Sequence, residues 1–407
     1  MTAAIDDNRI GPIRGRQADR ILAALAELLD EHRLAIVEAN RTDLNACPPG
    51  DHVIFDRLKV DNKKIDAMID SVRGVKSRES RIGEVIYSAA RPDGLRIENR
   101  RVPFGTILII FEARPDVCIE AASIALKAGN RILLKGGREA RNTNLFLAGL
   151  WQKSLEAMGS DAAFVRYLDI SREDTQRLIA GETERFDLVI PRGGEALIDF
   201  ALKNSKAPVL VSGRGNNFLY IDRDADLEMA LKIGLDGKSR LSVCNALDKV
   251  LFDKGLLGLE AFIGDLAAAY RNTGIHVFGD ELVQAADPSI KAIESEDVWY
   301  EEFLSAKIVF GLVDGLDKAI AKINKYSGGH SASIVTKNQA NAARFMHEVD
   351  SAAVYHNAST RFTDGGEFGL GAEIAISTQK LHFRGPLGAE HLLTNKWFVH
   401  GDGQVRG

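Results

Sequence analysis

The sequence predicts an α/β fold with two parallel-sheet domains and a small β element. Short continuous apolar runs, such as 106–111 (TILIIF), are typical of strands buried on both faces of a parallel sheet. These runs alternate with segments whose apolar residues recur at helical spacing, which is the rhythm of strand–helix–strand units. The chain of 407 residues also exceeds the usual size of one hydrophobic core. We therefore expect more than one such domain.

The first eighty or so residues predict helices, and a β hairpin follows them. Residues 15–45 place apolar side chains at helical spacing between charges, which indicates one or two amphipathic helices, and 61–72 indicates another. In 82–102, two β-rich runs flank an Arg-Pro-Asp-Gly turn signal. We expect this hairpin, with the C-terminal tail, to form a small β oligomerisation element.

The rest of the chain has the pattern of parallel sheets. The first predicted helix between strands ends at Gly129, a residue type that commonly ends helices. Parallel sheets bind ligands at the carboxyl ends of their strands. Strands are predicted at 106–111, 131–137, 163–169, 186–194, 248–253, 275–280, 306–313 and 331–337, with a domain boundary near Asp236.

Composition excludes several classes of protein. The formal net charge of −5 gives no electrostatic reason to expect nucleic-acid binding. No stretch approaches the roughly 20 apolar residues of a membrane span, and the N-terminus lacks the apolar segment of a secretory signal. The cysteines Cys47, Cys118 and Cys244 form no Cys-x-x-Cys pair, and no histidines form a metal-like pair. We expect a soluble cytoplasmic protein without a metal.

Cys244 lies between a helical segment and a predicted strand, with Lys238 and Arg240 shortly before it and Asn245 after it. Partial exposure and nearby positive charge make a thiol reactive by lowering its pKa. Burial as a small apolar residue is the commoner fate of a free cysteine, so the residues alone leave both roles open. Cys118, inside an apolar helix, is expected to pack in a core.

Three further segments contain residues suited to a ligand, although ordinary solvated turns remain alternatives for each. Lys135 ends an apolar strand before two glycines, where its ammonium suits a ribose or phosphate. Gly193 and Gly194 open a helix, whose first N–H groups suit a phosphate. Residues 213–218 (GRGNNF) fail the last position of the usual dinucleotide fingerprint. The loop 357–363 (NASTRFT) concentrates donors that suit a small polar anion or amino acid, namely Asn357, Ser359, Thr360 and Arg361.

The order of these segments, and several longer strings, resemble a known family. The strings FEARPDV, LLKGG, VIPRGG, SVCNAL, NASTRFTDGGEFGLGAE and STQKLHFRGP are similar to those of the γ-glutamyl phosphate reductases, in the aldehyde dehydrogenase superfamily. The resemblance implies an aldehyde dehydrogenase-like fold and an oxidoreductase of proline biosynthesis. The implied reaction is NADPH-dependent reduction of L-glutamyl 5-phosphate to L-glutamate 5-semialdehyde and phosphate.

The resemblance also implies roles for residues. Cys244 falls on the nucleophile that forms a thioester, and the loop 357–363 falls where related enzymes anchor the far end of the substrate. The implied cofactor residues are Lys135 and Glu302, which fall on ribose-binding positions, and Gly193 and Gly194, which fall on the turn facing the cofactor. The implied domains are a cofactor-binding domain over 1–236, a catalytic domain over 237–375 and a C-terminal segment, 376–407, that returns to the first.

Guanidinium groups suit the two anions of this substrate, so we expect Arg240 to bind the leaving phosphate and Arg361 the α-carboxylate. Asn245 is a candidate donor to the oxyanion. Arg114 occupies roughly the place of the superfamily's carbonyl-polarising asparagine. Arg138 stands where NAD-preferring relatives have an acid, which favours NADPH.

One departure from the superfamily concerns water. Hydrolytic members carry a glutamate base where this chain has Val211-Ser212-Gly213, so phosphate rather than water is expected as the second substrate of the reverse reaction. An acyl-CoA-dependent enzyme would share Cys244 but not need the donor-rich loop. A non-catalytic scaffold is disfavoured by the intact Cys244, Lys135 and Glu302. We expect a homo-oligomer, not fused to a glutamate kinase, with such a kinase as a candidate partner.

Overall fold

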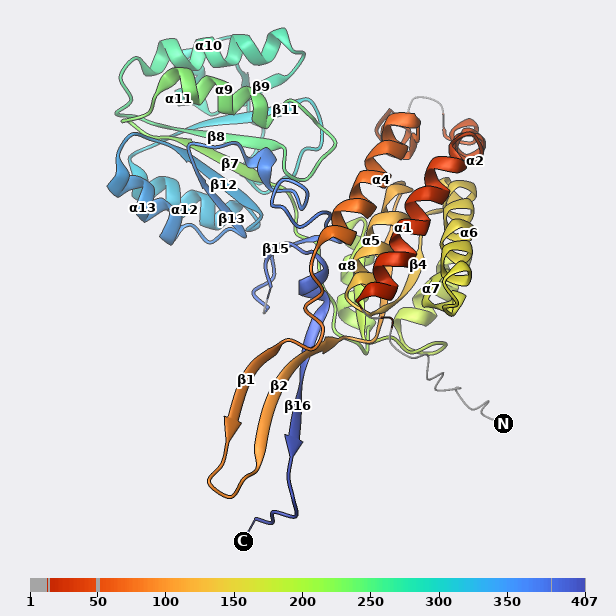
Figure 1. The fold of residues 1–407 in the computed structure, drawn as a ribbon. Coiled ribbons are helices and arrows are strands. Elements are labelled where there is room, and N and C mark those ends of the chain that lie inside the picture. The colour runs from red at the N-terminus through yellow and green to blue at the C-terminus, as the bar shows by residue number, and fades with distance from the viewer. Residues whose placement is uncertain (1–12, 14, 49–51, 382, 407) are drawn as a thin grey trace. The chain divides into compact units, whose positions relative to one another are not determined.

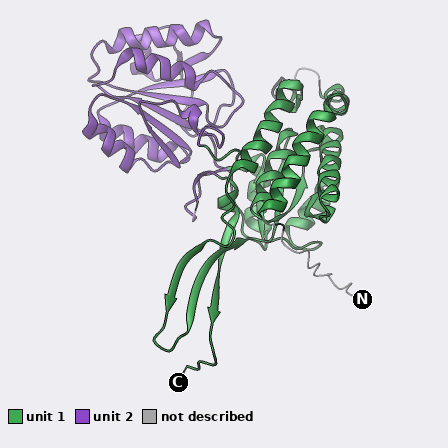
Figure 2. Cartoon of the chain, in the orientation of Figure 1, with its two compact units in different colours: residues 1–211, 369–375, 387–407 green, residues 212–368, 376–386 purple. Residues whose placement is uncertain are grey.

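The computed structural model describes residues 13, 15–48, 52–381 and 383–406, which divide between two compact units (Figures 1 and 2). The first unit comprises residues 1–211, 369–375 and 387–407, and the second comprises 212–368 and 376–386. The N-terminal stretch, in which no secretory signal is expected, lies outside the described residues. No described helix is long and apolar enough to cross a membrane.

A four-stranded parallel sheet with the order β5-β4-β3-β6 is the core of the first unit. Leu108, Ile110 and Leu133 point to one face, where α7 and α8 pack, because successive side chains of a strand alternate between faces. α5 and α6 pack against β4 and β5, and Gly129 follows α5 with a φ of 74°. The strands predicted within 106–194 are confirmed as β3 (Thr106–Phe111), β4 (Arg131–Lys135), β5 (Val165–Tyr167) and β6 (Leu188–Arg192). The helices between and after them are α5 (Asp116–Lys127), α6 (Arg141–Ala157), α7 (Arg172–Ile179) and α8 (Glu195–Asn204).

Helices predicted before the sheet are also confirmed. α1 contacts α4 and α6, and its stripe of Ile21, Leu22, Leu25 and Leu29 is buried as the amphipathic pattern predicts. Asp61 caps α4 by accepting the Lys64 N–H at 2.9 Å. The helices are α1 (Arg16–Glu31), α2 (Arg33–Asn45), α3 (His52–Leu58) and α4 (Asn62–Ser77).

A three-stranded antiparallel arm extends from the first unit (Figure 1). β1 (Val85–Ala90) and β2 (Arg96–Pro103) form the predicted hairpin, and β16 (Leu393–His400) pairs with β2 along its whole length. The C-terminal segment therefore returns to the first unit. The rings of Tyr87 and Trp397 contact each other on the arm at 5.6 Å, and both side chains are exposed.

The second unit contains a seven-stranded, wholly parallel sheet with the order β10-β9-β11-β8-β7-β12-β13. The helices α9 (Leu227–Gly237), α10 (Leu259–Asn272) and α11 (Glu281–Ala286) cover one face, and α12 (Leu316–Tyr326) and α13 (Gln339–Glu348) cover the other (Figure 1). The strands are β7 (Asn217–Ile221), β8 (Leu247–Asp253), β9 (His276–Gly279), β10 (Lys291–Ala292), β11 (Lys307–Val313), β12 (Ser331–Val335) and β13 (Ala353–His356), and β14 (Ile376–Ser377) pairs separately with β15 (Gly385–Pro386).

The observed division differs from the boundary expected near Asp236. β7 hydrogen-bonds between β8 and β12, and α9 packs on the same sheet, so residues 212–236 belong to the second unit. β7 was not among the predicted strands, because the polar run that precedes its five residues resembled a ligand-binding turn. The C-terminal stretch is also divided, since 369–375 belongs to the first unit and 376–386 to the second.

Asn130 joins distant segments of the first unit. Its fully buried side chain accepts the Gly105 N–H at 2.9 Å and donates to the Leu392 carbonyl at 2.8 Å. It thereby fixes the start of β3 to the segment that leads into β16. Among the described residues, neither backbone group has another hydrogen-bond partner, so the side chain makes both contacts.

We predict that Asn130→Ala lowers the free energy of unfolding of the first unit by about 2–4 kcal/mol, because it leaves a partly buried N–H and a buried carbonyl unsatisfied. Urea denaturation measures the change. Asn204→Ala is the matched control, since Asn204 makes an exposed contact to the Phe200 carbonyl and should change stability by less than about 0.5 kcal/mol. Equal effects of the two substitutions would contradict the structural role of Asn130.

Candidate active site

The predicted cofactor residues of the first unit meet at one edge of its sheet. In the sheet register, Ile110 of β3 lies beside Lys135 of β4 and Pro191 of β6, so these strands end together. Lys135 is half-buried, and its ammonium donates to the Gly136 carbonyl at 2.6 Å. Burial holds the pKa of Lys135 below its usual value, although the Asp169 and Glu139 carboxylates act in the opposite direction. A half-buried ammonium at a strand end is well placed to bind hydroxyl groups.

Arg138 and the glycine pair lie at the same edge. Arg138 is exposed, and its guanidinium makes no hydrogen bond or ion pair with the part of the chain that the structure describes. The Gly194 N–H donates to Glu112 at 2.9 Å, so a carboxylate occupies the donor that was predicted to face the cofactor. An added Cβ would lie 2.7 Å from Glu112 at Gly193 but would meet nothing closer than 3.9 Å at Gly194. Glu112 begins one of the strand ends expected to bind a ligand but was not among the predicted site residues.

A charged cluster follows β3. Burial disfavours the ionised form of Asp116, but the charges of Lys64, Arg114 and Arg192 outweigh it and hold the Asp116 pKa below its usual value. Lys64 makes an ion pair with Asp116. One turn further along α5, burial and then the Asp116 charge raise the pKa of Glu120 to about 8. Arg114, the candidate oxyanion donor, thus belongs to a charged network of the first unit.

Cys244 lies in the second unit, in the segment between α9 and β8, and it is partly exposed. The Asn217 side chain donates to the carbonyl of Cys244 at 2.7 Å and to that of Ala246 at 2.6 Å. A Cβ on Gly215 would lie only 1.7 Å from the Cys244 carbonyl oxygen, so only glycine permits this close approach. Cys118 is fully buried as predicted, and burial raises its pKa to about 12.

The predicted substrate loop is joined to the residue after Cys244. The Asn245 amide donates to the carbonyls of Arg361 at 3.0 Å and Thr363 at 3.1 Å, and the Arg361 guanidinium donates to the Asn245 oxygen. Thr360 donates its hydroxyl hydrogen to the Asn245 carbonyl at 3.0 Å. Both amide hydrogens of Asn245 are therefore used by the loop, and the side chain has none left for an oxyanion.

Two other predicted substrate residues shape the loop itself. Asn357 has a φ of 56°, and its side chain accepts the Thr336 N–H at 3.0 Å and donates to the Thr336 carbonyl at 3.1 Å. Ser359 accepts the Arg361 N–H at 3.2 Å and so begins the short helix Thr360–Phe362. The structure brings the predicted loop residues together, and the side chains of three of them, Asn357, Ser359 and Thr360, are engaged with backbone.

The positive charges near Cys244 are not equivalent. Lys238 is fully buried and makes an ion pair with Asp248 at 2.6 Å, so its charge is neutralised within the unit. Arg240 is exposed and makes no hydrogen bond or ion pair within the described ranges. Lys238 and Arg240 were both expected to act near the thiol. Only Arg240 presents a charged group that has no partner among the described residues.

Glu302 lies between two peptide groups held by neighbouring residues of β8. Lys249 donates to the Glu301 carbonyl at 2.8 Å, and Asp248 accepts the Phe303 N–H at 2.9 Å. Sequence reasoning missed both residues. Their signal was two adjacent charges in a strand whose seven positions are all buried.

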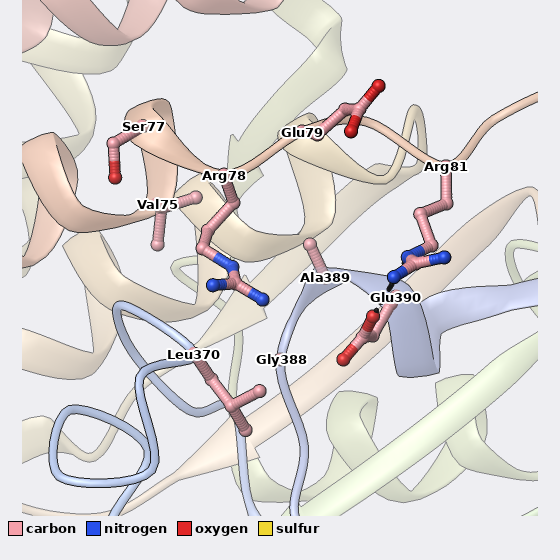
Figure 3. A pocket seen from close by; sticks show the side chains of 9 residues that line it. All are labelled: Val75, Ser77, Arg78, Glu79, Arg81, Leu370, Gly388, Ala389 and Glu390. Atoms are coloured by element: carbon pink, nitrogen blue, oxygen red, sulfur yellow. Dashed lines mark ion pairs between the residues drawn. The ribbon is translucent and has the colours of Figure 1, made fainter.

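A pocket of about 250 Å³ in the first unit contains none of the predicted site residues (Figure 3). It lies between the end of α4 and the segment 388–390. Arg78 points toward Leu370, while Arg81 makes an ion pair with Glu390 at 3.2 Å. This pocket is therefore not the predicted active site.

Comparison with known proteins agrees with this arrangement. Residues 12–287 match the aldehyde dehydrogenase family. The γ-glutamyl phosphate reductase of Clostridium beijerinckii is 42% identical over 404 residues, which cover 98% of this chain and 96% of the relative. The chain belongs to the γ-glutamyl phosphate reductases of the aldehyde dehydrogenase family. The expected family and fold class are thereby confirmed.

Two solved structures are similar to this chain. The crystal structure of γ-glutamyl phosphate reductase from Thermotoga maritima is 40% identical, with a TM-score of 0.89 and coverage of 96% of this chain and 95% of that one. An acetylating aldehyde dehydrogenase from Geobacillus thermoglucosidasius has a TM-score of 0.71 at 16% identity, covering 96% and 93% of the two chains. The second similarity shows the shared fold alone.

Glu120 provides a pH test of the charged cluster. Its folded pKa of about 8 lies above the usual value of 4.5. The folded state then binds more protons than the unfolded state between these pH values, so this group's contribution to stability is lost as the pH rises. We predict that Glu120→Gln gains stability relative to the parent chain from pH 5 to pH 8, with little further gain above. Urea denaturation across this range measures the free energy of unfolding of both proteins. The prediction is wrong if the difference between the variant and the parent chain does not change with pH.

Proposed function

We propose that this chain catalyses NADPH-dependent reduction of L-glutamyl 5-phosphate to L-glutamate 5-semialdehyde and phosphate through a thioester on Cys244. The observation that carries the proposal is the segment around Cys244. It combines a partly exposed thiol, a backbone held by Asn217 and a direct connection through Asn245 to the Arg361 loop. Such a rigid support is what a nucleophile needs to attack one defined carbonyl.

The chain's residues divide the reaction into two easier steps. The Cys244 thiolate attacks the acyl carbon, forming a carbon–sulfur bond, and the carbon–oxygen bond to phosphate breaks with its electron pair leaving on phosphate. A bound reduced nicotinamide cofactor supplies the hydride that the acyl carbon then accepts. Collapse of the tetrahedral intermediate releases the aldehyde and restores the thiolate. Backbone N–H groups near Cys244 would stabilise the oxyanion, with Arg114 as the side-chain candidate.

The two substrate anions have separate candidate partners. Arg240, with its free guanidinium, would bind the leaving phosphate, and Arg361 would bind the α-carboxylate through the donors that it does not use on Asn245. Ser359 and Thr360 would line this end of the substrate. We assign Asn245 and Asn357 the role of holding the loop, because their side-chain amides are engaged with it or with neighbouring backbone.

The second substrate of the reverse reaction would be phosphate. In the segment 211–213, where hydrolytic relatives carry a glutamate, this chain has Val, Ser and Gly and therefore no carboxylate. At the last of these residues, the Gly213 N–H donates to the Ile376 carbonyl at 2.9 Å. Water activation by this route is therefore disfavoured, in line with a thioester that phosphate resolves.

The candidate cofactor residues fit a phosphorylated nicotinamide cofactor. Lys135 of the first unit and Glu302 of the second unit would hold its riboses, and Gly193 and Gly194 would face it. The unpaired Arg138 supports NADP over NAD, because the additional 2′-phosphate of NADP needs a cation. The open space at Gly194 is compatible with a cofactor near the backbone.

The proposed partners are a second copy of the chain and a glutamate kinase. The arm supports a homo-oligomer, because it exposes Val85, Ile86, Tyr87, Trp397 and Val399, and exposed apolar groups of this kind commonly mark interfaces. The kinase follows from the chemistry of the substrate, since a labile acyl phosphate must be made by transfer of a phosphoryl group to a carboxylate.

The reverse assay tests the proposed reaction. We predict that the chain reduces NADP with L-glutamate 5-semialdehyde only when phosphate is present, and that Cys244→Ser lowers the rate by at least about 10³-fold, as loss of a nucleophile does. Cys47→Ser, which changes a cysteine of the first unit, should retain activity. Turnover without phosphate, or with coenzyme A in its place, would overturn the proposal.

Cofactor preference is tested at Arg138. We predict that Arg138→Ala raises the KM for NADPH by roughly 10- to 100-fold, because a charge-assisted hydrogen bond contributes about 1.5–3 kcal/mol, while the KM for NADH stays constant. Arg141→Ala is the control, since Arg141 is also exposed but is paired with Asp169. Parallel changes for both cofactors would show that Arg138 does not read the 2′-phosphate.

A further inference from the structure

The peptide groups on both sides of Glu302 are held by side chains from one strand. Lys249 donates to the Glu301 carbonyl at 2.8 Å, and the Phe303 N–H donates to Asp248 at 2.9 Å. Because Asp248 and Lys249 are adjacent in β8, they constrain both ends of a three-residue segment. These two contacts constrain the backbone on both sides of Glu302.

Both holding residues are buried and charged, which is costly unless they have a specific partner. Lys249 is fully buried, lies 3.7 Å from the centre of the Phe303 ring and also donates to Asn216 at 2.8 Å. Asp248 is balanced by the buried Lys238 at 2.6 Å. Burial lowers the pKa of Lys249 to about 7. Apolar residues at positions 248 and 249 would pack equally well. The presence of charged residues there is therefore explained by their hydrogen bonds to residues 301 and 303.

Backbone strain lies directly after this segment. Leu304 has a φ of 45°, and Leu304 and Asn357 are the two non-glycine positions among the described residues with positive φ. A left-handed conformation costs about 1–2 kcal/mol for a residue with a β-carbon, and it persists where the surroundings enforce it. Asp248 holds the Phe303 N–H one residue before Leu304, and Lys249 holds the Glu301 carbonyl three residues before it, so both contacts restrain this stretch of backbone.

The same network extends to the nucleophile. Asn216, the second acceptor of Lys249, donates to the carbonyls of Trp299 at 2.7 Å and Tyr326 at 2.8 Å. The next residue, Asn217, donates to the Cys244 carbonyl. Asn216 thus contacts Lys249, which holds the Glu301 carbonyl, while the adjacent Asn217 holds the Cys244 carbonyl.

We propose that Asp248 and Lys249 are positioning residues that fix the Glu302 carboxylate in the orientation that binds the cofactor ribose, at a set distance from Cys244. This inference rests on the proposed function only for the role of Glu302 in binding the nicotinamide cofactor. According to this inference, Asp248 and Lys249 affect the affinity for the cofactor. They do not affect the reactivity of the Cys244 thiol.

The experiment measures cofactor binding separately from thiol reactivity. We predict that Lys249→Met raises the Kd for NADPH, measured by fluorescence titration, on the order of tenfold, the usual effect of losing a residue that supports a site residue. The rate of Cys244 alkylation by iodoacetamide should stay within about twofold of the parent chain. Lys322→Met is the matched control, because Lys322 is a partly buried lysine of the same unit that lies over the Trp299 ring at 3.4 Å without contacting residues 301–303. It should leave the Kd unchanged.

A second variant guards against misfolding. Lys249→Gln keeps an N–H donor and should raise the Kd less than Lys249→Met, and it carries the test if the methionine variant does not fold. A Kd within twofold of the parent for both variants would overturn the inference, as would a Lys322→Met effect of equal size. The titration does not require turnover. If the chain binds NADPH but does not act on the glutamyl substrate, the proposed reaction is wrong, and the titration still tests this inference.

Discussion

The predicted catalytic segments of the second unit depend on side-chain amides at the start of β7. The loop that contains Cys244 and the segment that contains Glu302 lie outside regular strands, so their backbone carbonyls need other partners. Asn217 satisfies the carbonyls of Cys244 and Ala246, and Asn216 satisfies those of Trp299 and Tyr326. Two consecutive asparagines thus hold the backbone at Cys244 and the backbone at Trp299, three residues before Glu302, to the start of one buried strand.

Much of the fold was predictable because its strands are buried on both faces. Continuous apolar runs identified β3, β4, β6, β8, β11 and β12, since parallel sheets covered by helices leave no polar face. β7 is buried at all five positions too, but its run begins with the asparagine pair and follows glycines, a pattern shared with ligand-binding turns. The domain boundary was therefore placed after β7 and α9 instead of before them. Local pattern does not distinguish a polar residue that binds a ligand from one that satisfies the chain's own backbone.

The candidate site was only partly predictable, for the same reason. The positions of Cys244, Lys135 and Arg361 followed from motifs, but the partners of their neighbours are contacts between residues distant in sequence. Asn245 was a reasonable oxyanion donor until the carbonyls of Arg361 and Thr363, 116 and 118 residues away, were seen to use its amide. Lys238 was likewise expected to act on the thiol, but its ammonium makes a buried ion pair with Asp248.

The two strained residues indicate how this unit supports its function. Asn357 adopts its left-handed conformation at low cost, because asparagine tolerates it and the side chain bonds to the Thr336 backbone. Leu304 has no such compensation of its own. Its conformation requires an external constraint, and the buried charges of β8 lie where that constraint is needed. Buried ionic groups add little net stability compared with apolar ones, so their presence beside Leu304 is better explained by the geometry they impose on Glu302 than by the stability of the sheet.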